Sequence, residues 1–277
     1  MRITFIGGGN MAKALLGGLI GQGYSPSGMQ VVEPYAELHE TLSQQFGVRC
    51  VTAVDASSLL CDTVVLAVKP QQMREALTPL YGKLEQQLVV SIAAGIRLAD
   101  ISRWLGGYLR LARAMPNTPA LIGKGVSGLF ADPSVDQSGR LNAERVLNAV
   151  GSILWLQDEA QIDAVTAISG SGPAYVFYFI EAVEAAARQL GFDEPAARKL
   201  TMETFLGATQ LAAQSAESIS TLRQQVTSKG GTTEAALKSF AVSGIAAEIA
   251  QGIEAAALRG RELGDSLGCD AGASGHA

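Results

Sequence analysis

A cluster of glycines near the start of the chain has the spacing of a nucleotide-binding turn. The segment Gly7-Gly8-Gly9-Asn10-Met11-Ala12 follows the apolar run Arg2-Ile3-Thr4-Phe5-Ile6 and gives the pattern G-x-G-x-x-A. Gly7 allows a tight turn, Gly9 lets the backbone approach a pyrophosphate, and Ala12 lets the next helix pack on the strand. The helix N-terminus adds free N–H groups and the positive end of its dipole. Glycine clusters also form ordinary strand-to-helix turns, but this order of strand, turn and helix favours a redox cofactor.

Three later loops also follow apolar runs and have unusual content: Lys69-Pro70, Ala93-Ala94-Gly95 and Pro116-Asn117-Thr118-Pro119. Ligands of open parallel sheets bind where the carboxyl ends of the strands run into loops. Small residues and prolines there leave room for a flat ring and fix the backbone. Routine turn chemistry explains any one of these loops, but explains all of them together less easily.

The segment Thr227-Ser228-Lys229-Gly230-Gly231-Thr232-Thr233-Glu234 is rich in hydroxyls and precedes a helical pattern. Its hydroxyls, its N–H groups beside two glycines and the new helix N-terminus suit a small carboxylate. The alternative is that Thr232 or Thr233 simply caps the following helix.

Metal-centred and triad chemistry are not expected. The histidines are His39 and His276, and the cysteines Cys50, Cys61 and Cys269 include no C-x-x-C pair. These residues are too few and too scattered for a zinc site, a disulfide framework or a Ser-His-Asp triad. The chemistry is therefore expected to come from a bound organic cofactor, without a metal.

Composition predicts a two-domain enzyme with ample core, since 277 residues with 48% hydrophobic content exceed what one core usually serves. The net charge of −5 comes without a basic cluster, so we expect no nucleic acid and no anionic membrane as partner. Apolar runs stay shorter than a bilayer span, and the chain enters its first strand without a cleavable leader. The expected location is cytoplasmic.

The pattern of elements predicts an α/β fold in the first half and helices in the second. Strands after the first are expected at Gln30–Val32, Val48–Val51, Thr63–Val68, Leu88–Ile92, Arg110–Met115, Val126–Phe130 and Ile153–Leu156. Uninterrupted apolar runs among them are typical of parallel strands covered on both faces. Long helices are expected from Pro173 to about Leu190, Pro195 to Ala216 and Gly244 to about Leu267.

We therefore predict an N-terminal Rossmann-type dinucleotide-binding domain over residues 1–157 and an all-helical domain over 158–277. Residues 270–277 are expected to fray. The helices are apolar on several faces, which favours an oligomer interface, while burial within a monomer core explains any single position equally well.

In order along the chain, these motifs resemble those of the Δ1-pyrroline-5-carboxylate reductases. The segments that carry the resemblance are Phe5 to Met11, Ala67 to Pro70, Ser91 to Gly95, Ala114 to Ala120, Ser169 to Tyr175 and Gly230 to Thr233. The resemblance extends over residues 1 to 267. It implies reduction of pyrroline-5-carboxylate to L-proline, the last step of proline biosynthesis, by a reduced nicotinamide cofactor, and dimers joined through the helical domain, often within larger rings.

The resemblance also implies roles for particular residues. For the cofactor these are Ile6, Gly7, Gly8, Gly9, Asn10 and Met11 at the pyrophosphate, Ala67, Val68, Lys69 and Pro70 along the cleft, and Ile92, Ala93, Ala94 and Asn117 at the nicotinamide end. For the substrate they are Ser228, Gly230, Gly231, Thr232 and Thr233, with Thr233 beside the imine. Lys229 stands where many members have proline, so it either adds a charge near the substrate carboxylate or points to solvent.

The choice between NADH and NADPH stays open at this level. Glu33 stands near the position of an acid that binds a ribose 2′-hydroxyl and repels a 2′-phosphate, and no lysine or arginine lies between Gln30 and Gln45. These features favour NADH. The resemblance implies NADPH, and Glu33 has the freedom to rotate away.

The motifs contain no histidine as general acid, so the substrate is expected to bind as the iminium or to take its proton from solvent while Thr233 orients the nitrogen. Another imine reductase or a hydroxyacid dehydrogenase on the same architecture is one alternative, because fold does not determine substrate. A protein that senses NAD(P) without turnover is the other.

Overall fold

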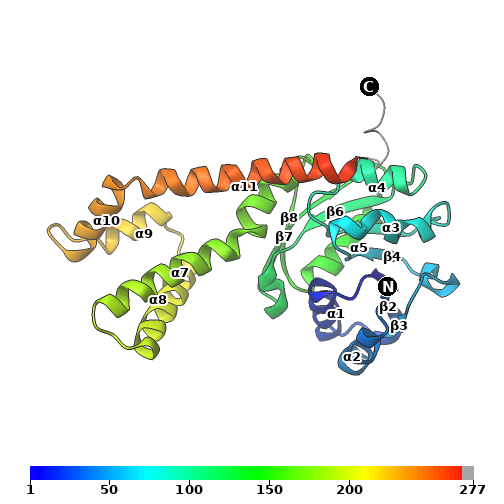
Figure 1. Cartoon of the computed structure of the whole chain (residues 1–277), viewed down its shortest axis with the longest axis horizontal. Helices are drawn as coiled ribbons and strands as arrows, with labels where there is room; N and C mark the ends of the chain where they lie inside the picture. Colours follow the sequence, from blue (N-terminus) through cyan, green and yellow to red (C-terminus); the bar gives the residue numbers. More distant parts are fainter. Residues whose placement is uncertain (270–277) are drawn as a thin grey trace. The chain divides into compact units, whose positions relative to one another are not determined.

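The computed structural model describes residues 1–269, so the expected fraying of residues 270–277 lies outside the described residues. The chain forms two compact units (Figure 1). The first comprises Met1–Ser171 together with residues 256–269, and the second is Gly172–Ala255. These bounds differ from the expected division at residue 157, because α6 (Gln161–Val165) and the π-helical turn Thr166–Gly170 belong with the sheet unit.

The first unit contains an eight-stranded sheet in the order β3-β2-β1-β4-β5-β6-β7-β8. This order and the parallel pairing of the first six strands confirm the predicted Rossmann-type fold. The strands are β1 Ile3–Ile6, β2 Met29–Val32, β3 Arg49–Val51, β4 Thr63–Leu66, β5 Leu88–Ser91, β6 Leu111–Met115, β7 Gly125–Ala131 and β8 Gly151–Trp155.

Helices cover both faces of this sheet, as the alternation of side chains along each strand requires. On one face Phe5 packs in a core with α1 (Asn10–Gly21), α2 (Glu37–Phe46) and α5 (Gln137–Asn148). On the other face Ile6 packs with α3 (Met73–Leu77) and α4 (Leu98–Trp104). Short 3₁₀ turns at Pro26–Gly28, Ala56–Leu59, Pro70–Gln72, Thr78–Leu80 and Thr118–Ile122 complete the connections.

Strand β7 departs from the repeating parallel pattern, since it pairs antiparallel with β6. The connection between them holds only the 3₁₀ turn Thr118–Ile122. A parallel return needs a crossover of a dozen or more residues, whereas an antiparallel one does not. Strand β8 is again parallel to β7, after a connection that contains α5.

The second unit is helical, as predicted. It contains α7 (Gly172–Gln189), α8 (Glu194–Gln214), α9 (Ile219–Gln225), α10 (Thr232–Val242) and the first part of α11 (Ile245–Gly268). Side chains cap α8 and α9: Asp193 accepts from the Ala196 N–H at 2.9 Å, and Ser218 accepts from the Thr221 N–H at 3.1 Å. Helix α9 was not predicted, because seven residues carry too little periodicity.

Within residues 1–269, no single helix has the length and apolar composition to span a membrane. Helices α10 and α11 meet that criterion only as a pair, and the pair is bent by 53°.

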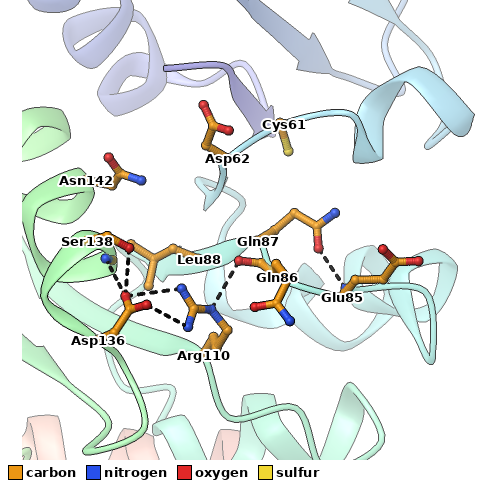
Figure 2. A pocket seen from close by; sticks show the side chains of 11 residues that line it. Cys61, Asp62, Glu85, Gln86, Gln87, Leu88, Arg110, Asp136, Ser138 and Asn142 are labelled. Carbon is orange, nitrogen blue, oxygen red and sulfur yellow. Dashed lines mark hydrogen bonds and ion pairs between the residues drawn. The ribbon is translucent and has the colours of Figure 1, made fainter.

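A polar hollow of about 370 Å³ lies at the amino ends of β4, β5 and β6 (Figure 2). Figure 2 shows the Arg110 side chain between Asp136 and the Gln86 backbone; its Nε donates to the Gln86 carbonyl at 3.1 Å, and a terminal nitrogen lies 3.3 Å from Asp136 Oδ1. Asp136 also caps α5 by accepting the Gly139 N–H at 2.8 Å. The hollow is therefore built around a helix cap, at the opposite end of these strands from the glycine turn.

The hydrogen bond from the Gly139 N–H, then those from Ser138 and Arg110, lower the pKa of Asp136 from 3.8 to about 2. A carboxyl group whose folded pKa is lowered stabilises the fold above its unfolded pKa and loses this effect as pH falls through the folded one. Asp136→Asn should therefore lower the Tm at pH 7, and the difference from wild type should disappear between pH 4 and 2. Thermal unfolding across this pH range measures it. Glu85→Gln, an exposed acid beside the same hollow, is the control; an equal loss there would contradict the interpretation.

Candidate functional site

Gly7 makes the turn that brings β1 against the end of β4. Its φ of +99° is in the left-handed region, which side chains rarely adopt. A Cβ at this position would lie 2.9 Å from the Ala67 carbonyl oxygen and 3.0 Å from Val68 Cγ1. The turn is closed by hydrogen bonds from the Gly7 N–H to the Val32 carbonyl and from the Ala67 N–H to the Ile6 carbonyl, each 2.8 Å. Only glycine fits this position.

Gly9 differs from Gly7, because a Cβ added there meets no atom within 4 Å. It is the N-cap of α1 and provides no side-chain hydrogen bond to the first turn. The first regular backbone hydrogen bond of the helix runs from the Lys13 N–H to the Gly9 carbonyl at 3.0 Å, so the N–H groups before Lys13 in this helix lack intrahelical partners. An open surface of unpaired amides at a helix N-terminus fits a pyrophosphate.

The sheet brings most of the predicted cofactor residues to one edge. In register, Ile6 pairs with Leu66 and Leu66 with Ser91, so the loops after β1, β4 and β5 leave the sheet at the same level. The residues collected there are Ile6, Gly7, Gly8, Gly9, Asn10, Met11, Ala67, Val68, Lys69, Pro70, Ile92, Ala93 and Ala94. Their roles toward the cofactor stay predictions.

Glu33 follows β2 at this same edge and is only 6% exposed. One carboxylate oxygen accepts the Gly8 N–H at 2.9 Å, and the other accepts the Tyr35 N–H at 3.1 Å. Its carbonyl oxygen accepts a hydrogen bond of 2.6 Å from His39 Nε2. The carboxylate is therefore held against the glycine turn.

Asn117, expected at the nicotinamide end, is buried after β6, and both its amide nitrogen and its amide oxygen are hydrogen-bonded. Its Nδ2 donates to the Ser169 carbonyl at 3.1 Å, and its Oδ1 accepts the Val126 N–H at 3.0 Å. These bonds tie the loop after β6 to β7 and to the π-helical turn, so the side chain fixes the backbone of the loop.

The predicted substrate residues Ser228, Gly230, Gly231, Thr232 and Thr233 are brought together in the second unit, before α10. The residue that caps α10 is Gly231, and no side chain caps the helix, so the capping alternative for the threonines is wrong. Thr232 and Thr233 instead occupy the first turn, where helix amides lack intrahelical partners.

One amide in this loop is already taken, because Glu234 Oε2 accepts the Gly230 N–H at 2.7 Å. Gly230 has a φ of +73°, which favours glycine, and a Cβ on Gly231 would meet the Ser228 side chain. A hollow of about 650 Å³ lies beside it, lined partly by Gly231 and Lys238. Lys229 is exposed.

Two features around the cofactor edge were missed in the sequence. Arg113 of β6 is 1% exposed and lies 3.1 Å from Glu159 and 3.4 Å from Asp163. Glu159 also accepts the Leu98 N–H at 2.8 Å, which joins β6 to the start of α4. An arginine inside an otherwise apolar strand was the available signal, because a buried charge needs a partner.

The second feature is the packing of the last turns of α11 on the loop after β5. A Cβ on Gly264 would lie 3.0 Å from the Gly95 carbonyl oxygen, and Arg97 pairs with Asp265 at 2.7 Å. The small residues of the Ala93-Ala94-Gly95 loop therefore serve helix packing as well as any ligand. Their contact partner is far away in sequence, so no local pattern marks it.

Together, the sheet order, the glycine turn and the free amides define a dinucleotide-binding α/β protein with a separate helical unit. Residues 2–95 match the family described as NADP oxidoreductase, coenzyme F420-dependent, and residues 159–263 match pyrroline-5-carboxylate reductase dimerisation. In residues 1–269 no group of three or more His, Cys, Asp or Glu side chains is placed to hold a metal ion.

Comparison with characterised proteins narrows this class. The pyrroline-5-carboxylate reductase of Pseudomonas aeruginosa is 46% identical over 268 residues, which is 96% of this chain and 98% of the relative. The structure of the Coxiella burnetii enzyme has a TM-score of 0.87 at 39% identity, covering 95% of this chain and 98% of that one. The Plasmodium falciparum enzyme, with NADP bound, has a TM-score of 0.85 at 25% identity and the same coverage. The chain belongs to the pyrroline-5-carboxylate reductase family, which confirms the resemblance seen in its motifs.

The open space at Gly9 gives a direct test of the cofactor edge. Gly9→Ala should lower the Tm of the free protein only slightly, since the new methyl group meets no protein atom and the remaining cost is that alanine is a poorer N-cap than glycine. If a pyrophosphate approaches this backbone, the same variant should weaken NADH or NADPH binding by about tenfold or more. Isothermal titration and thermal unfolding on one sample measure both. Gly21→Ala, at the opposite end of α1 from the glycine turn, is the control, because a Cβ there also meets no atom within 4 Å and its φ is not in the left-handed region. Unchanged binding in Gly9→Ala would move the pyrophosphate elsewhere.

Proposed function

We propose that this protein reduces Δ1-pyrroline-5-carboxylate to L-proline with NAD(P)H, the last step of proline biosynthesis. The observation that carries the proposal is 46% identity to a pyrroline-5-carboxylate reductase over 96% of the chain. Two features of this structure support it: a helix N-terminus open to a pyrophosphate, and a hydroxyl-rich loop suited to a small carboxylate.

The cofactor residues proposed are those of the glycine turn and the loops after β4 and β5, with Glu33 at the ribose and Asn117 fixing the loop at the nicotinamide end. The unpaired amides at the start of α1 and the open space over Gly9 fit the pyrophosphate. When bound, the reduced nicotinamide supplies a hydride. The protein binds and orients it, and excludes water from the reacting atoms.

For the substrate, we propose that the first turn of α10 binds the carboxylate. The positive end of the helix dipole and the unpaired amides of Thr232 and Thr233 favour a negative charge there. The Thr233 hydroxyl, which has no hydrogen-bond partner within residues 1–269, orients the ring nitrogen. Reduction adds a hydride to the imine carbon and a proton to the nitrogen. That proton comes with the iminium or from solvent, because the chain offers only His39 and His276 as histidines and neither lies in these motifs.

Turnover tests the function. Oxidation of NADH or NADPH, followed by its absorbance, should depend on pyrroline-5-carboxylate and yield L-proline. A hydroxyacid with the oxidised cofactor should give no signal. Hydroxyacid oxidation without imine reduction would make the protein a dehydrogenase, and cofactor binding without any turnover would make it a sensor.

The role of Thr233 separates catalysis from helix stability. Since Gly231 caps α10, Thr233→Ala should change the Tm little. It should lower kcat/KM by about tenfold or more, equal to about 1.4 kcal/mol of transition-state binding. Thr233→Ser keeps the hydroxyl and should retain most activity. Wild-type kinetics in Thr233→Ala would remove this residue from the active site.

We also propose that the helical unit forms a homodimer, within a larger assembly or alone. A mainly apolar groove of about 870 Å³ lies between helices of this unit, lined by aromatic and aliphatic side chains that include Tyr178, Phe179, Val183, Phe205 and Ile249. Tyr178 is 69% exposed in the single chain, and such apolar surface is normally covered by a partner.

Light scattering at micromolar concentration should find a dimer or larger. Val183→Asp should shift the mass toward the single chain, because a charge would be buried in the groove. Gln45→Asp on α2 makes the same charge change on an exposed position of the sheet unit and is the control. A stable, active wild-type monomer would contradict the interface.

A cytoplasmic location without nucleic-acid or membrane partners completes the proposal. Cys50, Cys61 and Cys269 are free thiols, as is usual in reducing compartments, and the net charge is −5. Cell fractionation checks the location; recovery in a membrane pellet would contradict it.

A further inference from the structure

We propose that Glu33 makes this enzyme select NADH over NADPH. The proposal rests on the function above and deepens it, since it assigns the cofactor and the residue that discriminates. Its basis is a buried carboxylate, held in place at the end of β2, on the sheet edge where the glycine turn begins.

The two hydrogen bonds of Glu33 fix where its charge lies. Because Oε2 accepts from Gly8 N–H at 2.9 Å and Oε1 accepts from Tyr35 N–H at 3.1 Å, neither oxygen is free to swing away without breaking a bond. Breaking them would leave one buried and one partly buried donor unpaired, which is costly. The alternative in which Glu33 rotates away from the ribose is therefore unfavourable.

Each carboxylate oxygen can accept more than one hydrogen bond, so capacity remains after the two backbone bonds are made. Hydroxyl groups of a ribose are donors that match this remaining capacity. A 2′-phosphate has no such donors when ionised, and it brings a charge of nearly −2 toward a carboxylate. The Glu33 carboxylate, held in this position, therefore favours binding of a 2′-hydroxyl and disfavours binding of a 2′-phosphate.

The segment that follows β2 provides no lysine or arginine to offset this repulsion. The segment from Gln30 to Val48 contains no lysine or arginine. Its one histidine, His39, contacts the Glu33 carbonyl oxygen through Nε2 at 2.6 Å, so that nitrogen is already used. Arg49, next along the chain, begins β3 and pairs with Asp55 at 3.0 Å. It lies at the amino end of the strand, away from the glycine turn.

The bond to Gly8 has a second consequence for the cofactor. It removes one of the amides of the glycine turn from the set available to phosphate oxygens. The pyrophosphate must then rely on the amides that follow at Gly9 and in the first turn of α1, where the surface is open. Ribose recognition and pyrophosphate recognition thus use adjacent but separate groups.

The experiment measures binding without turnover. Titration calorimetry at pH 8, where histidine side chains are ordinarily neutral, gives the Kd of NADH and NADPH, and of ADP-ribose and its 2′-phosphate, which lack the nicotinamide. The wild type should bind each 2′-hydroxyl compound about tenfold or more tightly than its phosphorylated counterpart. Glu33→Ser should reduce that ratio by about tenfold or more. Glu33→Gln, which keeps an acceptor for the Gly8 N–H, should reduce it in the same direction.

Glu40→Gln is the matched control, because it removes the same charge from an exposed position of α2, where Glu40 accepts a hydrogen bond from Gln44 on the same helix. Its ratio should equal that of the wild type. Equal or tighter binding of NADPH by the wild type would overturn the proposal, as would an unchanged ratio in both Glu33 variants. Either of these two outcomes would overturn the NADH preference but would not contradict the proposed reductase function. Failure of the wild type to bind either dinucleotide would overturn both proposals.

Discussion

The close approach of Gly7 to Ala67 is the constraint on which the nucleotide-binding unit depends. Strands β1 and β4 lie side by side although a whole β-α-β segment separates them in sequence. From this pair the sheet extends through β2 and β3 on one side and through β5 to β8 on the other. A Cβ on Gly7 would lie 2.9 Å from the Ala67 carbonyl oxygen, so the turn has no room for a side chain. Because the turn is that tight, α1 begins directly over the sheet edge, and its unpaired amides face outward there.

Around this turn, buried polar groups decide which surfaces remain available to a ligand. Glu33 takes the Gly8 amide, Asn117 holds the loop after β6, and Arg113 with Glu159 anchors the start of α4. Each of these side chains meets backbone groups or opposite charge, although the buried Arg113 Nε has no hydrogen-bond partner among residues 1–269. These buried side chains therefore fix the backbone of the loops at this edge, while the surface at Gly9 remains accessible to a ligand.

Sequence patterns were sufficient where the controlling interactions are local. The strand positions followed from short apolar runs, and the glycine turn followed from its spacing and its place between strand and helix. The antiparallel direction of β7 did not follow from the apolar pattern, because that pattern looks alike in both directions. It is decided by the length of the preceding connection, which holds no crossover helix.

Other features depend on partners far along the chain. Gly264 is small because Gly95 lies opposite it, and Arg113 is tolerated because Glu159 and Asp163 neutralise it. The loop before α10 was ambiguous for a different reason: threonines beside glycines suit a cap as well as a ligand. Only the backbone shows that Gly231 is the N-cap residue, so neither the Thr232 nor the Thr233 hydroxyl caps the helix.

The small and neutral character of the proposed substrate residues fits the chemistry proposed for them. When a bound cofactor carries the hydride and the substrate arrives already protonated, the protein gains little from an acid or base near the reacting atoms. It gains from backbone amides, helix termini and hydroxyls in fixed positions, because these orient charged groups without titrating. Glycine, alanine and threonine supply such positions with the least bulk. Charged side chains are then kept for support, as with Arg113, and for recognition away from the reacting carbon, as proposed for Glu33.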